Sequence, residues 1–166
     1  MYSLNAPVPG RVSAIADDLF PQLSAFENVR EDHSLLVKRL ADDESYERVA
    51  NVVRSTLVGA PAFEVAVTGI DVFDAPPTGT APVVYLTVES PGLRQLHARL
   101  VDALGAVEHL EGDAYVPHVT LARDGPIDDA RRLADCEIEP VTWTVTELHL
   151  ADAHREHVLG TVSLPA

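Results

Sequence analysis

The sequence contains very little cysteine and lysine: Cys136 and Lys38 are the only residues of their kinds among 166. One cysteine cannot form an intrachain disulfide or a thiolate zinc cluster, which excludes disulfide-stapled secreted domains and cysteine-rich zinc modules. No apolar run reaches the roughly 18 residues that a membrane span requires. Residues 1–10 also lack the basic and apolar regions of a signal peptide. We therefore expect a soluble protein of the cytoplasm that does not bind membranes.

Basic residues are scarce as a class. The chain has 26 acidic residues against 12 basic ones, which gives a net charge of −14 and a pI near 4.7. Concentrated salt screens such self-repulsion, since the Debye length falls to about 3 Å at 1 M. The composition therefore indicates a halophilic protein in a cytoplasm of very high ionic strength, with an ordinary acidic protein as the alternative. There is no basic patch for duplex nucleic acid, so any RNA contact should be local.

Hydrophobic periodicity predicts an α+β chain. We expect strands at 2–8, 33–40, 63–73, 82–89, 118–123, 140–150 and 156–164, and helices at 12–23, 41–59, 91–104 and 126–135. The order strand, helix, histidine strand, helix, strand occurs twice, and each histidine strand begins with its histidine. We therefore predict one bilobal domain over residues 1–166, with pseudo-symmetric lobes at about 1–75 and 82–166.

The two histidine strands are the main candidates for a functional site. Their sequences are "HSLLVK" from His33 and "HVTLAR" from His118. Residues two apart on a strand share a face, so His118 and Thr120 should project together. An imidazole transfers protons near neutral pH, and a neighbouring hydroxyl stabilises a phosphoryl oxygen. If the lobes close around one cleft, the two histidines can act on one phosphate without a metal.

The segment "PHVTLAR" resembles the second motif of the 2H phosphoesterase superfamily, in its branch of 2'-5' RNA ligases and RNA 2',3'-cyclic phosphodiesterases. The resemblance implies two small, mostly antiparallel sheets with flanking helices around a central cleft. It also implies that His33 and His118 are catalytic, that Thr120 binds phosphate and that Arg123 binds an anion. The implied activity is metal-independent opening of 2',3'-cyclic phosphates to 2'-phosphates, with 2'-5' ligation as the reverse reaction.

The first motif departs from the family pattern. Leu35 stands where the family has Ser or Thr, and Ser34 comes one residue early. Either a β-bulge re-aims Ser34 towards the site, or this half has lost its hydroxyl. The same alternation places Lys38 and Arg123 on the face opposite their histidines unless the strands bend. We retain both as candidate phosphate-binding cations, together with Ser34.

Other residues give weaker signals. Tyr115, three residues before His118, either lines the cleft and contacts substrate or packs at a strand entry. His149, His154 and His157 follow no metal-site spacing, so we expect no metal and no cofactor. Glycine-rich phosphate loops and a nucleophile elbow are absent from the sequence. We expect a monomer whose partners are RNA termini or small cyclic nucleotides. The alternative is a degenerate relative that binds nucleotides or RNA ends without turnover.

Overall fold

The computed structural model describes residues 1–41, 43–153 and 157–165, and these residues form nine strands, four α-helices and one short 3-10 helix. In chain order the elements are β1 (Tyr2–Pro7), α1 (Gly10–Leu23), β2 (Asn28–Val29), β3 (Ser34–Leu40), α2 (Tyr46–Thr56), β4 (Phe63–Phe73), β5 (Val83–Glu89), α3 (Pro91–Leu104), η1 (Gly112–Ala114), β6 (His118–Arg123), α4 (Ile127–Ala134), β7 (Val141–Val145), β8 (Glu147–Asp152) and β9 (His157–Ser163).

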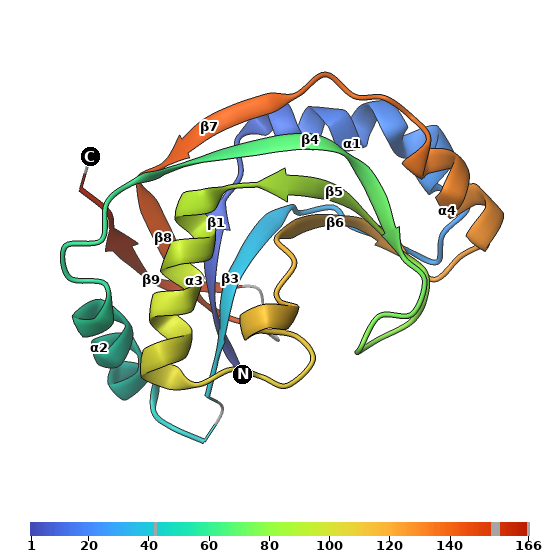
Figure 1. Cartoon of the computed structure of the whole chain (residues 1–166). Helices are drawn as coiled ribbons and strands as arrows, with labels where there is room; N and C mark the ends of the chain where they lie inside the picture. Colours follow the sequence, from blue (N-terminus) through green and yellow to red (C-terminus); the bar gives the residue numbers. More distant parts are fainter. Residues whose placement is uncertain (42, 154–156, 166) are drawn as a thin grey trace.

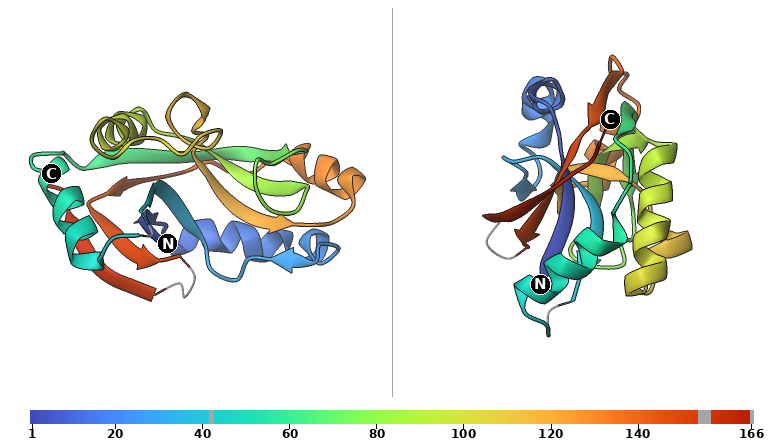
Figure 2. Two further views of the ribbon diagram at one scale, coloured as in Figure 1. Left: turned by 90° about the horizontal axis from the view of Figure 1, so that it is seen from below. Right: turned by 90° about the vertical axis from the view of Figure 1, so that its left-hand side faces the viewer.

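The strands form two antiparallel sheets, which confirms the predicted α+β class (Figure 1). Sheet A has the strand order β3-β1-β8-β9, and sheet B has the order β2-β6-β5-β4-β7. The helices lie at the outside of the molecule (Figure 2). Helix α3 packs on β3 and β4, α4 packs on β4 and β5, and α1 contacts β6. Among the described residues, no helix is long and apolar enough to cross a membrane.

Each sheet takes strands from both halves of the chain. Sheet B contains β2 and β4 from the first half, and sheet A contains β8 and β9 from the second half. A division of the chain at about 75–82 therefore does not separate the two sheets. The reason is local pairing: consecutive strands tend to pair in space, and the hairpin of β4 and β5 brings the end of the first half into sheet B.

The prediction of one strand over 140–150 was wrong. The segment forms two strands, of which β7 pairs with β4 in sheet B and β8 pairs with β1 in sheet A. The buried residues change phase between them: Val141 and Val145 are buried in β7, whereas Leu148 and Leu150 are buried in β8. Because a strand keeps one buried face at a period of two, this change of phase marks the crossing from one sheet to the other.

Helix α3 begins as its sequence indicates. The Ser90 hydroxyl accepts a hydrogen bond from Leu93 N at 3.1 Å, and Pro91 occupies the first turn, where a missing N–H costs nothing. Its buried face includes Leu93, Leu96, His97 and Leu100. This helix therefore holds a histidine against β3, next to the connection that leads to β6.

Candidate active site

A cavity of about 260 Å³ lies where strands of both sheets meet two connecting segments. Strand β3 of sheet A contributes Leu36 and Arg39, and strand β6 of sheet B contributes His118 and Arg123. The other lining residues belong to β4, β5, their connection and the connection from α3 to β6 (Figure 1): Phe73, Pro76, Pro77, Thr78, Val83, His109, Leu110, Ala114, Tyr115 and Val116. The cavity thus combines histidine and arginine side chains in a strongly acidic protein.

His118 lies at the first position of β6 and is held in one tautomer. Its Nδ1 lies 2.7 Å from the carbonyl oxygen of Val116, which can only accept a hydrogen bond, so Nδ1 carries the proton. This leaves the lone pair of the neutral ring on Nε2. Burial lowers the pKa of His118, and the positive charges of Arg39 and Arg123 lower it further, against the raising effect of the Val116 hydrogen bond. His118 is therefore neutral near pH 7 and suited to accept a proton.

Arg123 is placed in the cavity by a β-bulge. In β6, Thr120 pairs with Tyr85 and Ala122 pairs with Val84, so Leu121 is an extra residue between two registered pairs. The extra residue reverses the alternation of faces, and Arg123 then lies on the side of His118 although it is five positions further along. The sequence left the face of Arg123 open, and the bulge decides it in favour of the site.

Close contact with backbone and burial fix the Arg123 side chain. Its guanidinium packs against Gly79, which has φ +78, and a Cβ at this position would collide with Nη1. The Nε atom is shielded from solvent and has no hydrogen-bond partner among the described residues. Burial lowers the pKa of Arg123, and the nearby Arg30 lowers it further. The guanidinium is thus a partly desolvated cation whose Nε donor is unused among the described residues.

Thr120 lies on the side of β6 that carries His118, opposite Tyr85. It is partly buried and is not among the residues that line the cavity, so the strand face of Thr120 agrees with the prediction but its hydroxyl is not part of the lining.

Two aromatic rings lie against His118. The Tyr85 ring stacks on Phe73 with ring centroids 4.1 Å apart, and the His118 ring makes edge-to-face contacts with both, at centroid distances of 5.2 Å from Phe73 and 5.4 Å from Tyr85. Burial and the charge of Asp71 raise the pKa of Tyr85 to about 12. The rings of Phe73 and Tyr85 therefore pack against the imidazole of His118 and help to hold it in place.

Lys38 does not face the cavity. Its Nζ donates to Glu111 Oε1 at 2.6 Å, and the two side chains are only 3% and 1% exposed. The Glu111 carboxylate also accepts from Arg39 N at 2.8 Å and from Val107 N at 2.9 Å. Burial raises the pKa of Glu111, but these hydrogen bonds outweigh it and hold the pKa below its usual value. The only lysine therefore neutralises a buried carboxylate that ties the α3–β6 connection to β3.

Tyr115 lines the cavity but is also bound into this tie. Its ring stacks on His97 at 3.8 Å, and its hydroxyl donates to Leu36 O at 2.7 Å. His97 Nδ1 donates to Val37 O at 2.8 Å, while Nε2 accepts from Gly112 N at 3.0 Å, so this ring is neutral. Burial lowers the pKa of His97 and raises that of Tyr115. Both rings position the segment that leads into His118.

His33 precedes β3 and is not among the residues that line the cavity. Both of its ring nitrogens are shielded from solvent and have no hydrogen-bond partner among the described residues. Burial lowers the pKa of His33, against the raising effects of Asp17 and Asp32. Ser34 is exposed and begins β3. The structure thus brings His118, Arg123 and Tyr115 together in one cavity, but it does not place His33, Ser34 or Lys38 there.

Sequence reasoning missed Arg39 and Phe73, which both line the cavity. Arg39 follows Lys38 directly, and Lys38 was retained as the candidate cation although alternation from His33 placed it on the opposite face. Because Val37 is an extra residue in β3, Arg39 lies on the same side as Leu36, which also lines the cavity, and nothing in the local sequence marks the position of this bulge. Phe73 ends the strand 63–73, whose bounds were predicted correctly. Phe73 contacts Tyr85 and His118, which belong to other strands, so its place in the site could not be predicted from the segment 63–73 alone.

The histidines near the C-terminus lie outside the cavity. His149 Nε2 is 3.0 Å from Glu147 Oε1, and His157 begins β9. His154 falls outside the described residues. Within the described ranges, no group of three or more His, Cys, Asp or Glu side chains is arranged to hold a metal ion.

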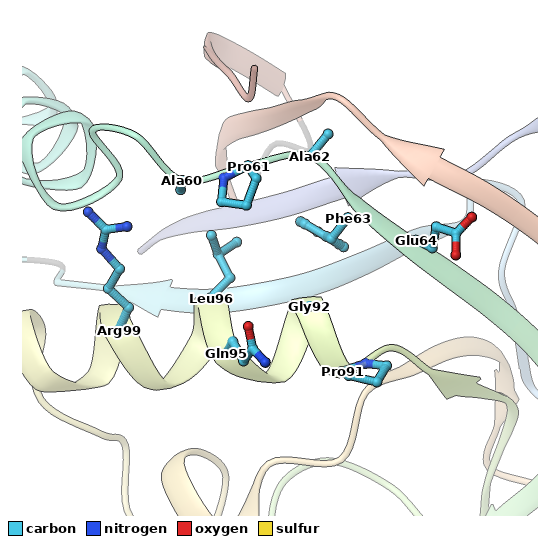
Figure 3. A pocket seen from close by; sticks show the side chains of 10 residues that line it. All are labelled: Ala60, Pro61, Ala62, Phe63, Glu64, Pro91, Gly92, Gln95, Leu96 and Arg99. Atoms are coloured by element: carbon cyan, nitrogen blue, oxygen red, sulfur yellow. The ribbon is translucent and has the colours of Figure 1, made fainter. Parts of the chain in front are cut away.

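A second and larger cavity, of about 520 Å³, lies between α3 and the start of β4 (Figure 3). Its charged lining residues are Glu64 and Arg99, and Arg99 Nη2 donates to Val58 O at 2.7 Å. None of its lining residues is a histidine, a serine or a threonine. The smaller cavity therefore contains the groups that can perform chemistry, despite its size.

Residues 33–157 match the 2'-5' RNA ligase superfamily. Solved structures similar over nearly the whole chain include E. coli LigT complexed with 3'-AMP, with a TM-score of 0.66, 20% identity, and coverage of 99% of this chain and 98% of that one. A crystal structure described as a phosphoesterase has a TM-score of 0.64 and 21% identity, with coverage of 99% of this chain and 98% of that one. A protein of Thermus thermophilus has a TM-score of 0.64 and 18% identity, with coverage of 98% of this chain and 97% of that one. These likenesses establish the LigT-like fold. No curated protein matches the sequence.

Proposed function

The chain belongs to the 2'-5' RNA ligase superfamily, and we propose that it is a metal-independent phosphodiesterase that opens 2',3'-cyclic phosphates at RNA ends or on small nucleotides. The observation that carries this proposal is the position of His118. Its neutral ring has Nε2 unprotonated, in a cavity that Arg39 and Arg123 also line. A proton acceptor beside two cations suits attack of water on a phosphodiester, because it can take the proton of the water while the cations stabilise the phosphoryl oxygens.

In the proposed reaction, His118 Nε2 takes a proton from water while the water oxygen attacks phosphorus. A new P–O bond forms, the bond from phosphorus to one ribose oxygen breaks, and that oxygen receives a proton. The product is a ribose phosphomonoester with one free hydroxyl. Arg39 and Arg123 stabilise the negative charge that accumulates on the phosphoryl oxygens, and Thr120 adds a hydroxyl donor from the same strand.

A second group must protonate the leaving oxygen. The sequence pairing assigns this role to His33, and we retain it as a proposal, because both ring nitrogens are without a hydrogen-bond partner among the described residues. The ring must first take up a proton before it can give one to the leaving oxygen, and burial, which lowers its pKa, opposes that step. His33 also does not line the cavity, and a two-histidine mechanism requires both rings to reach one phosphate.

Nucleotides are the substrate class that the comparisons favour. E. coli LigT, a protein of the same fold, has been crystallised with 3'-AMP and with ATP. A site that opens a cyclic phosphate by attack of water can also join ends when a ribose hydroxyl takes the place of the water as the nucleophile. We therefore propose 2'-5' RNA ligation, the reverse of cleavage of a 2'-5' linkage, as a further reaction of this site. We also propose that the protein is a monomer that works in a cytoplasm of high salt, which the acidic composition supports.

A second candidate function is nucleotide or RNA-end binding without turnover. The position of His33 outside the cavity lining favours it, because binding needs the cations but not two histidines. Hydrolysis of a panel of 2',3'-cyclic phosphates in concentrated KCl with EDTA separates the two candidates. Conversion of a cyclic phosphate to a monoester supports the phosphodiesterase. Saturable binding without product formation supports the second candidate.

A further inference from the structure

Strands β3 and β6 carry the same irregularity, although they lie in different sheets. In β6 the extra residue is Leu121, between the pairs made by Thr120 and Ala122. In β3 it is Val37, because Leu36 pairs with Asn5 and Lys38 pairs with Leu4. A bulge of this kind shifts the alternation of faces by one residue. It therefore gives a reference point for aligning the two strands that does not depend on matching their histidines.

Burial along the two strands supports this alignment. From Leu35 to Arg39 the residues are buried, partly buried, buried, buried and partly buried, and residues 119–123 repeat the same order. Aligned on the bulges, Leu36 corresponds to Thr120 and Arg39 corresponds to Arg123. The residue that corresponds to His118 is then Ser34, because both begin their strands. Matching His33 with His118 places the two strands one residue out of register.

We infer that sheet A contributes Arg39 to the site, and that Arg39 and Arg123 together bind a phosphate group that carries two negative charges. This inference rests on the proposed function only in its choice of a nucleotide as the ligand. Both arginines line the cavity that contains His118, one from each sheet. At the positions that correspond to His118 and Thr120, β3 carries Ser34 and Leu36, so Arg39 is the charged group that this strand contributes to the cavity.

The charges around the arginines leave them free for a ligand. Glu111 contacts the backbone N of Arg39, but its carboxylate is already paired with Lys38. Among the described residues, neither guanidinium forms an ion pair or a hydrogen bond with another side chain. The chain has 26 acidic residues against 12 basic ones, so two unpaired arginines beside one cavity are unexpected unless an anion binds there.

The number of charges indicates the kind of phosphate. A cyclic phosphodiester carries one negative charge, whereas a phosphomonoester above its second pKa of about 6 carries two. The two positive charges of the arginines, beside a neutral histidine, therefore match the two negative charges of the monoester better than the single charge of the diester. They also match the additional negative charge that forms while water attacks the diester. We expect 3'-AMP to bind more tightly than a nucleoside 2',3'-cyclic phosphate, and this preference should depend on both arginines.

Binding of 3'-AMP to Arg39→Gln, Arg123→Gln and Arg48→Gln tests the inference by calorimetry. Arg48 is a matched control: its side chain is 75% exposed on α2 and pairs with Glu44. We expect each cavity variant to bind 3'-AMP about 10- to 100-fold more weakly, the range for a lost hydrogen bond to a charged group, and the control to match the wild type. Unchanged binding by Arg39→Gln, or no binding by the wild type, would overturn the inference.

An NMR titration of His118 provides a readout that needs no activity. Arg39 lowers the pKa of His118 in the structure, so removal of its charge should raise that pKa, whereas Arg48→Gln should leave it unchanged. Unchanged titration in Arg39→Gln would contradict the placement of Arg39. The outcomes also separate this inference from the proposed function. If 3'-AMP binding depends on Arg39 but no cyclic phosphate is hydrolysed, the inference stands and the phosphodiesterase proposal fails.

Discussion

Arg39 and Arg123 occupy the same position, relative to a β-bulge, in two strands of different sheets, and both line the cavity that contains His118. The two strands therefore share this backbone feature, but the side chains around it differ. One strand supplies a histidine, a threonine and an arginine, whereas the other supplies a serine, a leucine and an arginine. The site combines proton transfer from one sheet with charge from both.

The two histidines that we propose as general base and general acid should each be needed for turnover. His118→Ala and His33→Ala should each lower kcat/KM by about 10² to 10⁴, the range for a general acid or base. His149→Ala is the control, because His149 pairs with Glu147 on β8. Since His33 does not line the cavity, a much smaller loss in His33→Ala than in His118→Ala would contradict the general-acid role of His33 and leave the role of His118 standing.

Thr120 should contribute through its hydroxyl. Thr120→Val keeps the shape of the side chain but removes the donor, so we expect a loss of about 2 to 4 kcal/mol in transition-state stabilisation, the scale of one oxyanion donor. Thr120→Ser retains the hydroxyl and should keep most of the activity. Ser34→Ala should lose less than Thr120→Val in steady-state kinetics. If Thr120→Val is as active as Thr120→Ser, the hydroxyl has no part in the reaction.

Buried histidine should make the fold sensitive to mild acid. The folded-state pKa of His97 is lowered from 6.5 by burial, so the unfolded chain binds a proton more readily. The neutral form of His97 therefore favours the folded state fully at pH values above 6.5. This contribution to the free energy of unfolding is lost as the pH falls from 6.5 through the lower pKa of the folded state. Melting temperatures at about pH 7.5 and about pH 5.5 measure this loss, because carboxylates titrate mostly below that window.

The matched variant for this prediction is His97→Gln. At about pH 7.5 the variant should have a lower melting temperature than the wild type, because glutamine does not reproduce the stacking on Tyr115. Its further decrease between the two pH values should be smaller than that of the wild type, with His33 and His118 accounting for the remainder. An identical decrease in both proteins would show that His97 is not the titrating group.

The Lys38–Glu111 pair should be costly to break from one side. Lys38→Met leaves the buried Glu111 carboxylate without its cation, which we expect to cost about 3 to 5 kcal/mol in the free energy of unfolding. The double variant Lys38→Met with Glu111→Gln removes both charges and should be more stable than Lys38→Met alone. Urea unfolding measures both values. A double variant less stable than either single variant would indicate that the two substitutions act independently.

Salt should stabilise the protein through screening. With a net charge of −14, self-repulsion acts over about 10 Å in 0.1 M salt but over only about 3 Å at 1 M. We therefore expect the melting temperature to rise between these KCl concentrations. Sucrose, which is excluded from the surface but screens no charge, is the control. A melting temperature independent of KCl would refute the proposal that the protein works in high salt.

Much of the fold could be predicted from periodicity, because most strands keep one buried face. The strands at 63–73 and 118–123 were predicted with their observed bounds. The error at 140–150 arose where the buried face changes phase near Thr146, a signal present in the sequence but read as one strand. The two-residue strand β2 is too short to have a periodicity of its own.

The site was harder to predict, because it depends on bulges. In β6 the bulge brings Arg123 to the face of His118, and the motif alone did not settle this question. In β3 the bulge brings Arg39 to the cavity and leaves Lys38 buried against Glu111. Backbone pairing with β1 and β5 fixes these positions, so the side chains of one segment carry no information about them.

Hydrolysis of a nucleoside 2',3'-cyclic phosphate in the presence of EDTA, by the wild type and by His118→Ala side by side, tests the account most directly. We predict that the wild type forms a nucleoside monophosphate at a rate that EDTA does not change. His118→Ala should bind 3'-AMP but convert the cyclic substrate at least about 10²-fold more slowly. Equal rates in the two proteins, or a wild-type rate that requires added zinc or manganese, would contradict the assignment of His118 and the metal-independent mechanism.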